Sequence, residues 1–120
     1  METVSPGEFD GLRLNRPGAW AVAFLADWCP FCREFRPLFE AFEGTGPFQT
    51  AVADLTDDEN PLWERFGIEV VPSLIAFVDG RPTLRVDGIS MEGLGPRDLE
   101  RLRAAFVPPS TGSRAVRGAP

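Results

Sequence analysis

Two mainly apolar runs of strand length lie in the first half of the chain. The first run, Trp20–Ala26, has no charged residue, and in the second, Phe48–Thr56, Asp54 is the one charged position. Runs of this length that do not alternate with polar residues are typical of strands covered on both faces. The sequence therefore predicts two buried strands.

Between these two runs the apolar spacing changes to that of a helix. Starting at Phe35, large apolar residues recur at i, i+3, i+4 and i+7, with charged residues on the other side. This spacing predicts a helix over 32–42. We expect Pro37 to kink it, because proline has no amide donor to continue the helical hydrogen bonds.

The second half of the chain predicts a short helix, a hairpin and a final helix. A polar turn and a short helix are expected within 57–68. Two apolar runs, Ser73–Val78 and Thr83–Val86, flank Asp79-Gly80, a pair that favours a tight hairpin turn. A proline near the first position and apolar residues at helical spacing predict a helix over 96–106.

The two ends of the chain carry weaker signals. The segment Gly7–Leu14 is expected to form a short helix, broken by the Asn-Arg-Pro-Gly sequence that follows. The Pro, Gly, Ser and Arg residues of 108–120 offer little to bury, which predicts a disordered tail. The resulting α/β order predicts one domain over 1–107, built on a mixed β-sheet with helices on both faces.

Composition and charge narrow the function classes. The chain has 120 residues, a formal net charge of −6 and no histidine. An acidic protein of this size is not expected to bind nucleic acid. No stretch reaches the roughly 18 apolar residues of a membrane span, and the first residues lack the pattern of a signal peptide. We therefore expect a cytoplasmic protein, with no membrane association, and a monomer.

The candidate chemistry lies in Cys29 and Cys32, the two cysteines of the chain. They follow a buried strand and open a helix, where free amides and the helix dipole favour a thiolate at Cys29. Cys32, one turn further in, is close enough to form a disulfide with it. This order predicts Cys29 as the nucleophile and Cys32 as the resolving thiol, with Pro30 tolerated at the helix start.

Two other interpretations of the pair stay open. Tetrahedral zinc takes about four ligands, and this chain offers two cysteines and no histidine, so we expect no bound metal. An inert structural disulfide is the remaining alternative. In a reducing cytosol, however, two close cysteines favour catalysis over a permanent disulfide.

Two separated motifs resemble the thioredoxin family. They are "AFLADWCPFC", followed by Pro37, and "FGIEVVPSLIAFVDGR" over 66–81. The resemblance covers roughly Phe9–Phe106 by the order of its elements. It implies a thioredoxin fold, a redox-active Cys29–Cys32 pair and no bound cofactor.

The resemblance also implies a substrate site. Pro72 matches the family's cis-proline, and Val71 before it would offer backbone groups to an extended peptide. Gly88 falls near a glycine that keeps the substrate groove open. The residues expected to contact substrate are Trp28, Pro30, Phe31, Val71, Pro72 and Gly88.

The sequence departs from the family at two points. Ala23 stands where the family usually has a buried aspartate that accepts the proton of the resolving cysteine. We expect Asp54, on the adjacent strand, to replace it as the buried catalytic carboxylate. The Pro-Phe dipeptide between the cysteines resembles glutaredoxins, but the Gly-Gly associated with glutathione binding is missing after "VVPS".

The implied function is a thiol–disulfide oxidoreductase that reduces protein disulfides through a mixed disulfide. Its partners would be disulfide-containing proteins and a thioredoxin reductase or another thiol reductant. One alternative is the reverse direction, an oxidant or isomerase. Another is a redox-inactive module that binds a protein through Trp28, Phe31 and Val71.

Overall fold

A five-stranded mixed sheet forms the centre of the computed structural model, which describes residues 1–106. β4 (Ala19–Leu25) lies in the middle, parallel to β5 (Gln49–Asp54) and antiparallel to β6 (Ser73–Val78). β7 (Arg81–Asp87) pairs with β6 on one side, and the two-residue β1 (Glu2–Thr3) pairs with β5 on the other. The predicted mixed sheet is therefore confirmed. The tail predicted at 108–120 lies outside the described residues.

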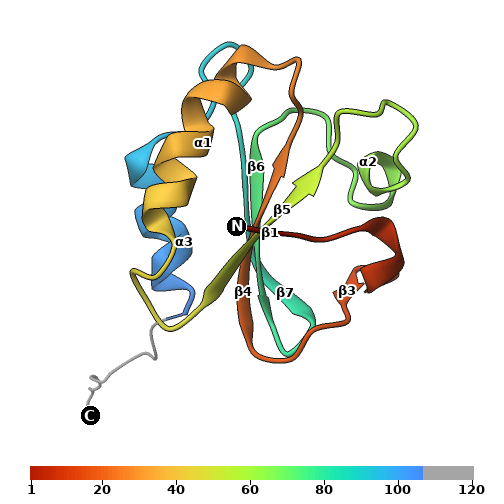
Figure 1. Ribbon diagram of the computed structural model, residues 1–120, viewed down its shortest axis with the longest axis vertical. Coiled ribbons are helices and arrows are strands. Elements are labelled where there is room, and N and C mark those ends of the chain that lie inside the picture. Colours follow the sequence, from red (N-terminus) through yellow and green to blue (C-terminus); the bar gives the residue numbers. More distant parts are fainter. Residues whose placement is uncertain (107–120) are drawn as a thin grey trace.

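Helices cover both faces of this sheet (Figure 1). α1 (Pro30–Phe42) and α3 (Pro96–Ala104) lie on one face. The short α2 (Leu62–Arg65) and the 3-10 turn η1 (Pro6–Glu8) lie on the other. The helices predicted over 32–42, within 57–68 and over 96–106 are present, and α1 runs through Pro37 and begins two residues earlier than its apolar spacing indicated.

The central strands are buried as their apolar composition requires. In β4, every residue from Trp20 to Leu25 is at most 5% exposed. Phe24 packs on Phe66 at 5.4 Å between ring centroids, on the face that carries α2. Because neighbouring residues of a strand point to opposite faces, Ala23 and Leu25 face the layer of α1 and α3.

Phenylalanine rings fill the layer between the sheet and the two long helices. They form a continuous series of stacked pairs, with centroids 4.8 to 6.1 Å apart. Such pairs contribute about 0.5–1.5 kcal/mol each beyond the area they bury. The series runs through Phe35, Phe39, Phe42, Phe48 and Phe106. It holds α1, and with it the cysteine pair, against the sheet.

The helix predicted at Gly7–Leu14 is wrong. Only η1 is helical there, and β2 (Phe9–Asp10) then pairs with β3 (Arg13–Leu14) as a small hairpin. Its two-residue loop begins with Gly11 at φ +62°, the conformation that glycine adopts at the first position of a II′ turn. Phe9 and Leu14 are opposite each other and both buried, so pairing across the turn outweighs the local helical pattern.

The hairpin predicted at Asp79-Gly80 is confirmed. Both residues have positive φ, +50° and +91°, as a type I′ turn requires. The Asp79 carboxylate accepts a hydrogen bond from the Gly18 amide at 2.9 Å. This contact ties the turn between β6 and β7 to the start of β4.

Candidate active site

Cys29 occupies the N-cap of α1, directly after the loop that leaves β4. Pro30 takes the first helical position, where its missing amide donor costs no hydrogen bond. No acidic residue stands in the first turn, so the positive end of the helix dipole is not offset there. Cys29 is 6% exposed, and its thiol donates to the Val71 carbonyl at 3.5 Å.

Cys32 lies one turn further along α1 and is only 3% exposed. The Ala26 amide donates to its sulfur at 3.4 Å. Mainly because burial disfavours the thiolate, the pKa of the Cys32 thiol is raised from an ordinary 9.0 to about 12, with Cys29 adding to the rise. The Ala26 hydrogen bond and the charge of Arg36 act in the opposite direction. Cys29 is therefore the outer thiol and Cys32 the inner one.

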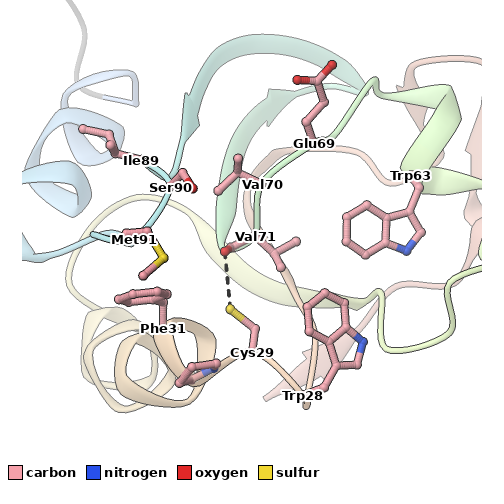
Figure 2. Close-up of a pocket in the computed structure, with 11 residues that line it drawn as sticks. Trp28, Cys29, Phe31, Trp63, Glu69, Val70, Val71, Ile89, Ser90 and Met91 are labelled. Carbon is pink, nitrogen blue, oxygen red and sulfur yellow. Dashed lines mark hydrogen bonds between the residues drawn. The ribbon is translucent and has the colours of Figure 1, made fainter.

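The Val71–Pro72 peptide is cis and precedes β6. It presents the Val71 carbonyl to Cys29, as the dashed line of Figure 2 shows. The Gly88 amide donates to the Pro72 carbonyl at 2.9 Å. A Cβ atom at Gly88 would lie 2.5 Å from that carbonyl oxygen, so this close approach requires glycine.

Trp28 is 52% exposed next to Cys29. Its ring stacks on Trp63, with centroids 6.2 Å apart and planes inclined by 9°. Both indole N–H groups donate to backbone carbonyls. The Trp28 indole donates to the Thr56 carbonyl at 3.0 Å, and the Trp63 indole donates to the Leu55 carbonyl at 3.2 Å. These two hydrogen bonds hold the pair of tryptophans in place, and both side chains line the groove that contains Cys29.

A groove of about 470 Å³ runs over Cys29 and Val71. In Figure 2 the two tryptophans stand on one side of Cys29, and Phe31 and Met91 stand on the other. Of the six expected substrate contacts, Trp28, Pro30, Phe31 and Val71 line the groove, whereas Pro72 and Gly88 do not. The further lining residues are Trp63, Glu69, Val70, Ile89, Ser90 and Met91.

Sequence reasoning assigned no role in the groove to these further residues. Glu69 and Val70 directly precede the cis peptide, and this bend before β6 brings them to the groove. Ile89 and Met91 offered one usable signal, since both are large apolar residues in a glycine-bounded loop outside any predicted element. They are 59% and 81% exposed.

The prediction that Asp54 is a buried acid is wrong. Asp54 ends β5 opposite Leu25 and is exposed. Its carboxylate accepts hydrogen bonds from the Thr56 amide and hydroxyl, at 2.9 and 2.5 Å. It therefore closes the turn after β5, a local role that short acidic side chains often take at strand ends.

Among residues 1–106, no other buried carboxylate takes the place of the missing acid. Ala23 is 0% exposed, and the buried polar residues among 1–106 are Thr50 and Ser73, neither of which is acidic. Over the same residues, no group of three or more His, Cys, Asp or Glu side chains is arranged to hold a metal ion. No helix in that part of the chain has both the length and the apolar character needed to cross a bilayer.

Comparison with known proteins gives one consistent result. The thioredoxin family model matches residues 1–98. The chain is 41% identical over 68 residues to a thioredoxin of Alicyclobacillus acidocaldarius, a match covering 56% of this chain and 65% of that protein. It is 33% identical over 82 residues to a thioredoxin of Rhodospirillum rubrum, covering 68% and 79%. A mutant thioredoxin from Halobacterium salinarum NRC-1 has a similar structure, with a TM-score of 0.62, 27% identity and coverage of 75% of both chains.

Proposed function

The chain belongs to the thioredoxin family of thiol–disulfide oxidoreductases, and we propose that it reduces protein disulfides through Cys29 and Cys32. The observation that carries the proposal is the asymmetry of the pair. Cys29 caps α1 beneath an open groove, and Cys32 is buried one turn behind it. An outer thiol can reach a foreign disulfide, and an inner thiol can reach only its neighbour.

The reaction proceeds in two exchanges. The Cys29 thiolate attacks one sulfur of the substrate disulfide, the substrate S–S bond breaks, and the departing substrate thiolate takes up a proton. Cys32 then loses its proton and attacks the Cys29 sulfur, which breaks the mixed disulfide. The substrate leaves as a dithiol and the Cys29–Cys32 disulfide forms, so two electrons pass from this protein to the substrate.

The substrate segment would lie extended along Val71. Backbone groups next to the cis-proline favour pairing with an extended strand, and the Val71 carbonyl is close enough to accept a hydrogen bond from Cys29. Trp28, Pro30 and Phe31 would contact the segment from the helix side. Pro72 and Gly88 would hold Val71 in place rather than touch the substrate.

Continued turnover needs an electron donor. By analogy with the family, we propose a thioredoxin reductase or another thiol reductant as this partner. A monomeric protein in the cytoplasm is the setting that fits this direction of electron flow, because the cytosol keeps thiols reduced.

Trapping tests the order of the cysteines. The Cys32→Ser variant should accumulate a mixed disulfide with a disulfide substrate, and the matched Cys29→Ser variant should form none. Capture by Cys32 in the second variant would contradict the assignment. If both cysteines can be changed to serine without loss of affinity for a protein partner, the chain is a binding module instead.

The reduction potential of the pair tests the direction. Equilibration in thiol and disulfide buffers, followed by alkylation, gives the fraction oxidised. A potential near that of cytosolic reductants, about −270 mV for thioredoxin, supports a reductant. A value near about −120 mV, as for strong oxidants, would show that the protein delivers disulfides.

A further inference from the structure

A third sulfur lies beside the cysteine pair. The chain has two methionines, Met1 and Met91. Met91 is 81% exposed, more than any other large hydrophobic residue among 1–106. It lines the groove that contains Cys29, and Figure 2 shows its side chain above the Phe31 ring, on one side of Cys29. A thioether that solvent and its solutes can reach therefore stands at the edge of the reactive thiol.

The loop 88–93 holds Met91 in this place. At one end of the loop the Gly88 amide donates to the Pro72 carbonyl at 2.9 Å. At the other end Gly93 lies against Phe31, where a Cβ atom would come within 3.0 Å of the Phe31 Cβ. Met91 lies between these two anchors with φ +69°, an uncommon conformation for a residue other than glycine. Because both ends of the loop are fixed, the thioether stays at the groove.

A substrate that covers the groove takes the Met91 side chain out of water. A thioether accepts this at little cost, because it is apolar and adapts its shape to its neighbours. A sulfoxide is polar, and burying its oxygen without a hydrogen-bond donor is unfavourable. The groove offers it few donors, since the Trp28 and Trp63 indoles already donate to backbone carbonyls and Glu69 carries a carboxylate. One oxygen added to Met91 therefore weakens the binding of an apolar segment.

The state of the cysteine pair decides when an oxidant reaches Met91. In the reduced protein the Cys29 thiolate reacts with a hydroperoxide first, and the resulting sulfenic acid condenses with Cys32 to form the disulfide. The disulfide form has no thiolate left to consume the oxidant. Met91 is then the exposed sulfur at the groove, so its oxidation follows when the supply of reductant falls behind the supply of oxidant.

We propose that Met91 is a redox-modification site: a hydroperoxide converts its thioether to the sulfoxide while the cysteines form the disulfide, and the sulfoxide slows the reduction of peptide disulfides. The O–O bond of the hydroperoxide breaks, one oxygen forms an S–O bond with Met91, and the rest leaves as an alcohol or water. The sulfur loses two electrons and the hydroperoxide gains them. This inference rests on the proposed function and adds a regulation of the same site.

The modification has a different lifetime from the disulfide. A thiol reductant reopens the Cys29–Cys32 disulfide by exchange, whereas a methionine sulfoxide is reversed by dedicated sulfoxide reductases. The lowered activity therefore outlasts the oxidant, after the cysteines have become dithiols again. Only repair of Met91 restores the full rate.

Mass spectrometry tests the site itself. The disulfide form is treated with hydrogen peroxide, and peptides from a digest give the sulfoxide content of both methionines over time. Met1 is the internal reference, because it is 44% exposed and lies outside the groove. We expect Met91 to gain one oxygen faster than Met1. Met91 left intact while Met1 is fully converted would overturn the proposal.

Two matched peptide disulfides measure the effect on activity. Short peptides with a single cysteine are oxidised to symmetrical dimers, with Phe or Ala beside the cysteine, and the ratio of their rates measures the selectivity for an apolar segment. Treated and untreated proteins are compared with dithiothreitol as the reductant. Oxidation should lower kcat/KM for the Phe peptide about tenfold, the ratio that one buried polar group without a partner gives. The Ala peptide should lose less, because its smaller side chain leaves the sulfoxide hydrated.

Variants assign the loss to Met91. Met91→Leu keeps an apolar side chain without a sulfur, so its rates should be the same before and after peroxide. Met1→Leu is the matched control and should lose activity as the wild-type protein does. Incubation of the treated wild-type protein with methionine sulfoxide reductases should restore its rates, because these enzymes remove the added oxygen.

The outcomes separate this regulation from the function itself. An equal loss in Met91→Leu and the wild-type protein would show that the damage lies elsewhere and would overturn the proposal. A wild-type protein that is fully converted at Met91 and keeps its rates would also overturn it, and the oxidoreductase activity would stand. An untreated protein that reduces neither peptide would contradict the proposed function.

Discussion

The proton of Cys32 controls the release of the substrate. Cys32 must become a thiolate before it can attack the mixed disulfide, and its pKa of about 12 leaves roughly 10⁻⁵ of it ionised at pH 7. Burial is the main cause of the raised pKa, so the pKa stays raised after Cys29 has bonded to the substrate, while the contribution of the Cys29 thiol is lost. Since the rate follows the ionised fraction, resolution of the mixed disulfide should accelerate about tenfold per pH unit between pH 6 and 9.

A carboxylate placed at Ala23 should remove this limit. Ala23 is fully buried and faces the layer of α1 that contains Cys32. A positioned general base contributes about 10²–10⁴-fold, so Ala23→Asp should speed resolution at pH 7 by at least about 10²-fold. Above the pKa of the new carboxyl group, which burial raises, the pH dependence should flatten.

The assay follows the mixed disulfide directly. Dithiol protein is mixed with a peptide disulfide between pH 6 and 9, quenched in acid at set times, and alkylated for mass spectrometry. Ala23→Asn is the matched control, because it adds similar volume and polarity without a proton acceptor. Asp54→Asn should keep the wild-type pH slope, since Asp54 is exposed and bound to Thr56.

Two results would refute this account. One is a wild-type resolution rate that does not change between pH 6 and 8, which would reveal an internal base. The other is an Asp variant that resolves no faster than the Asn variant while both remain folded by circular dichroism. The folding check is needed because an unpaired buried carboxyl group is destabilising.

Three further predictions concern stability and the groove. The reduced protein should lose stability as the pH rises from about 9 towards 12, because the pKa of Cys32 in the folded protein lies above its value in the unfolded protein. The disulfide form has no thiol to titrate and should not lose stability over this range. Urea denaturation of both forms between pH 8 and 11 checks this. Arg16→Gln should lower the free energy of unfolding by about 1–2 kcal/mol, since the Arg16 guanidinium binds Glu2 and Glu8 at 2.6 and 2.7 Å. Arg97→Gln, at an exposed position, is its control. Equal losses of stability in the two variants would contradict the prediction. Gly88→Ala should lower both stability and kcat/KM with peptide disulfides, because the new Cβ atom would force Gly88 away from the Pro72 carbonyl; an unchanged Tm and rate would show that the loop yields freely.

The sequence predicted best those elements whose signal lies within the element itself. The strand 19–25, the helix over the cysteines and the hairpin at Asp79-Gly80 each carry a complete local pattern of apolar residues or turn residues. Gly7–Leu14 failed because Phe9 and Leu14 pair across a turn, and a helical spacing of the same residues cannot be told from that pairing locally. The edge strand Glu2–Thr3 contains no apolar residue, so no apolar pattern predicts it.

The sequence predicted those site residues that lie within short motifs. It did not predict those that reach the site through contacts between residues far apart in the chain. The cysteines and the cis peptide stand in short motifs, so their residues could be named from the sequence. The position of the loop 88–93 depends on Gly93 meeting Phe31, a contact between residues far apart in the chain. Asp54 was misassigned because strand register places it beside Leu25 at the end of the pair, where solvent reaches it.

The missing carboxylate and the apolar groove act on the same step. While Cys32 is protonated, the mixed disulfide is not resolved, and the departed substrate thiol can return and reverse the first exchange. Contacts that keep the substrate segment seated on Phe31, Ile89 and Met91 do not ionise Cys32, but they stabilise the mixed disulfide against attack by the returning thiol. Selectivity should therefore be largest at low pH, where resolution is slowest, and should shrink in Ala23→Asp, where resolution is fast. The ratio of the Phe and Ala peptide rates, measured at pH 6 and pH 9 in both proteins, tests this coupling, and a ratio that is the same in all four conditions would show that the two features act separately.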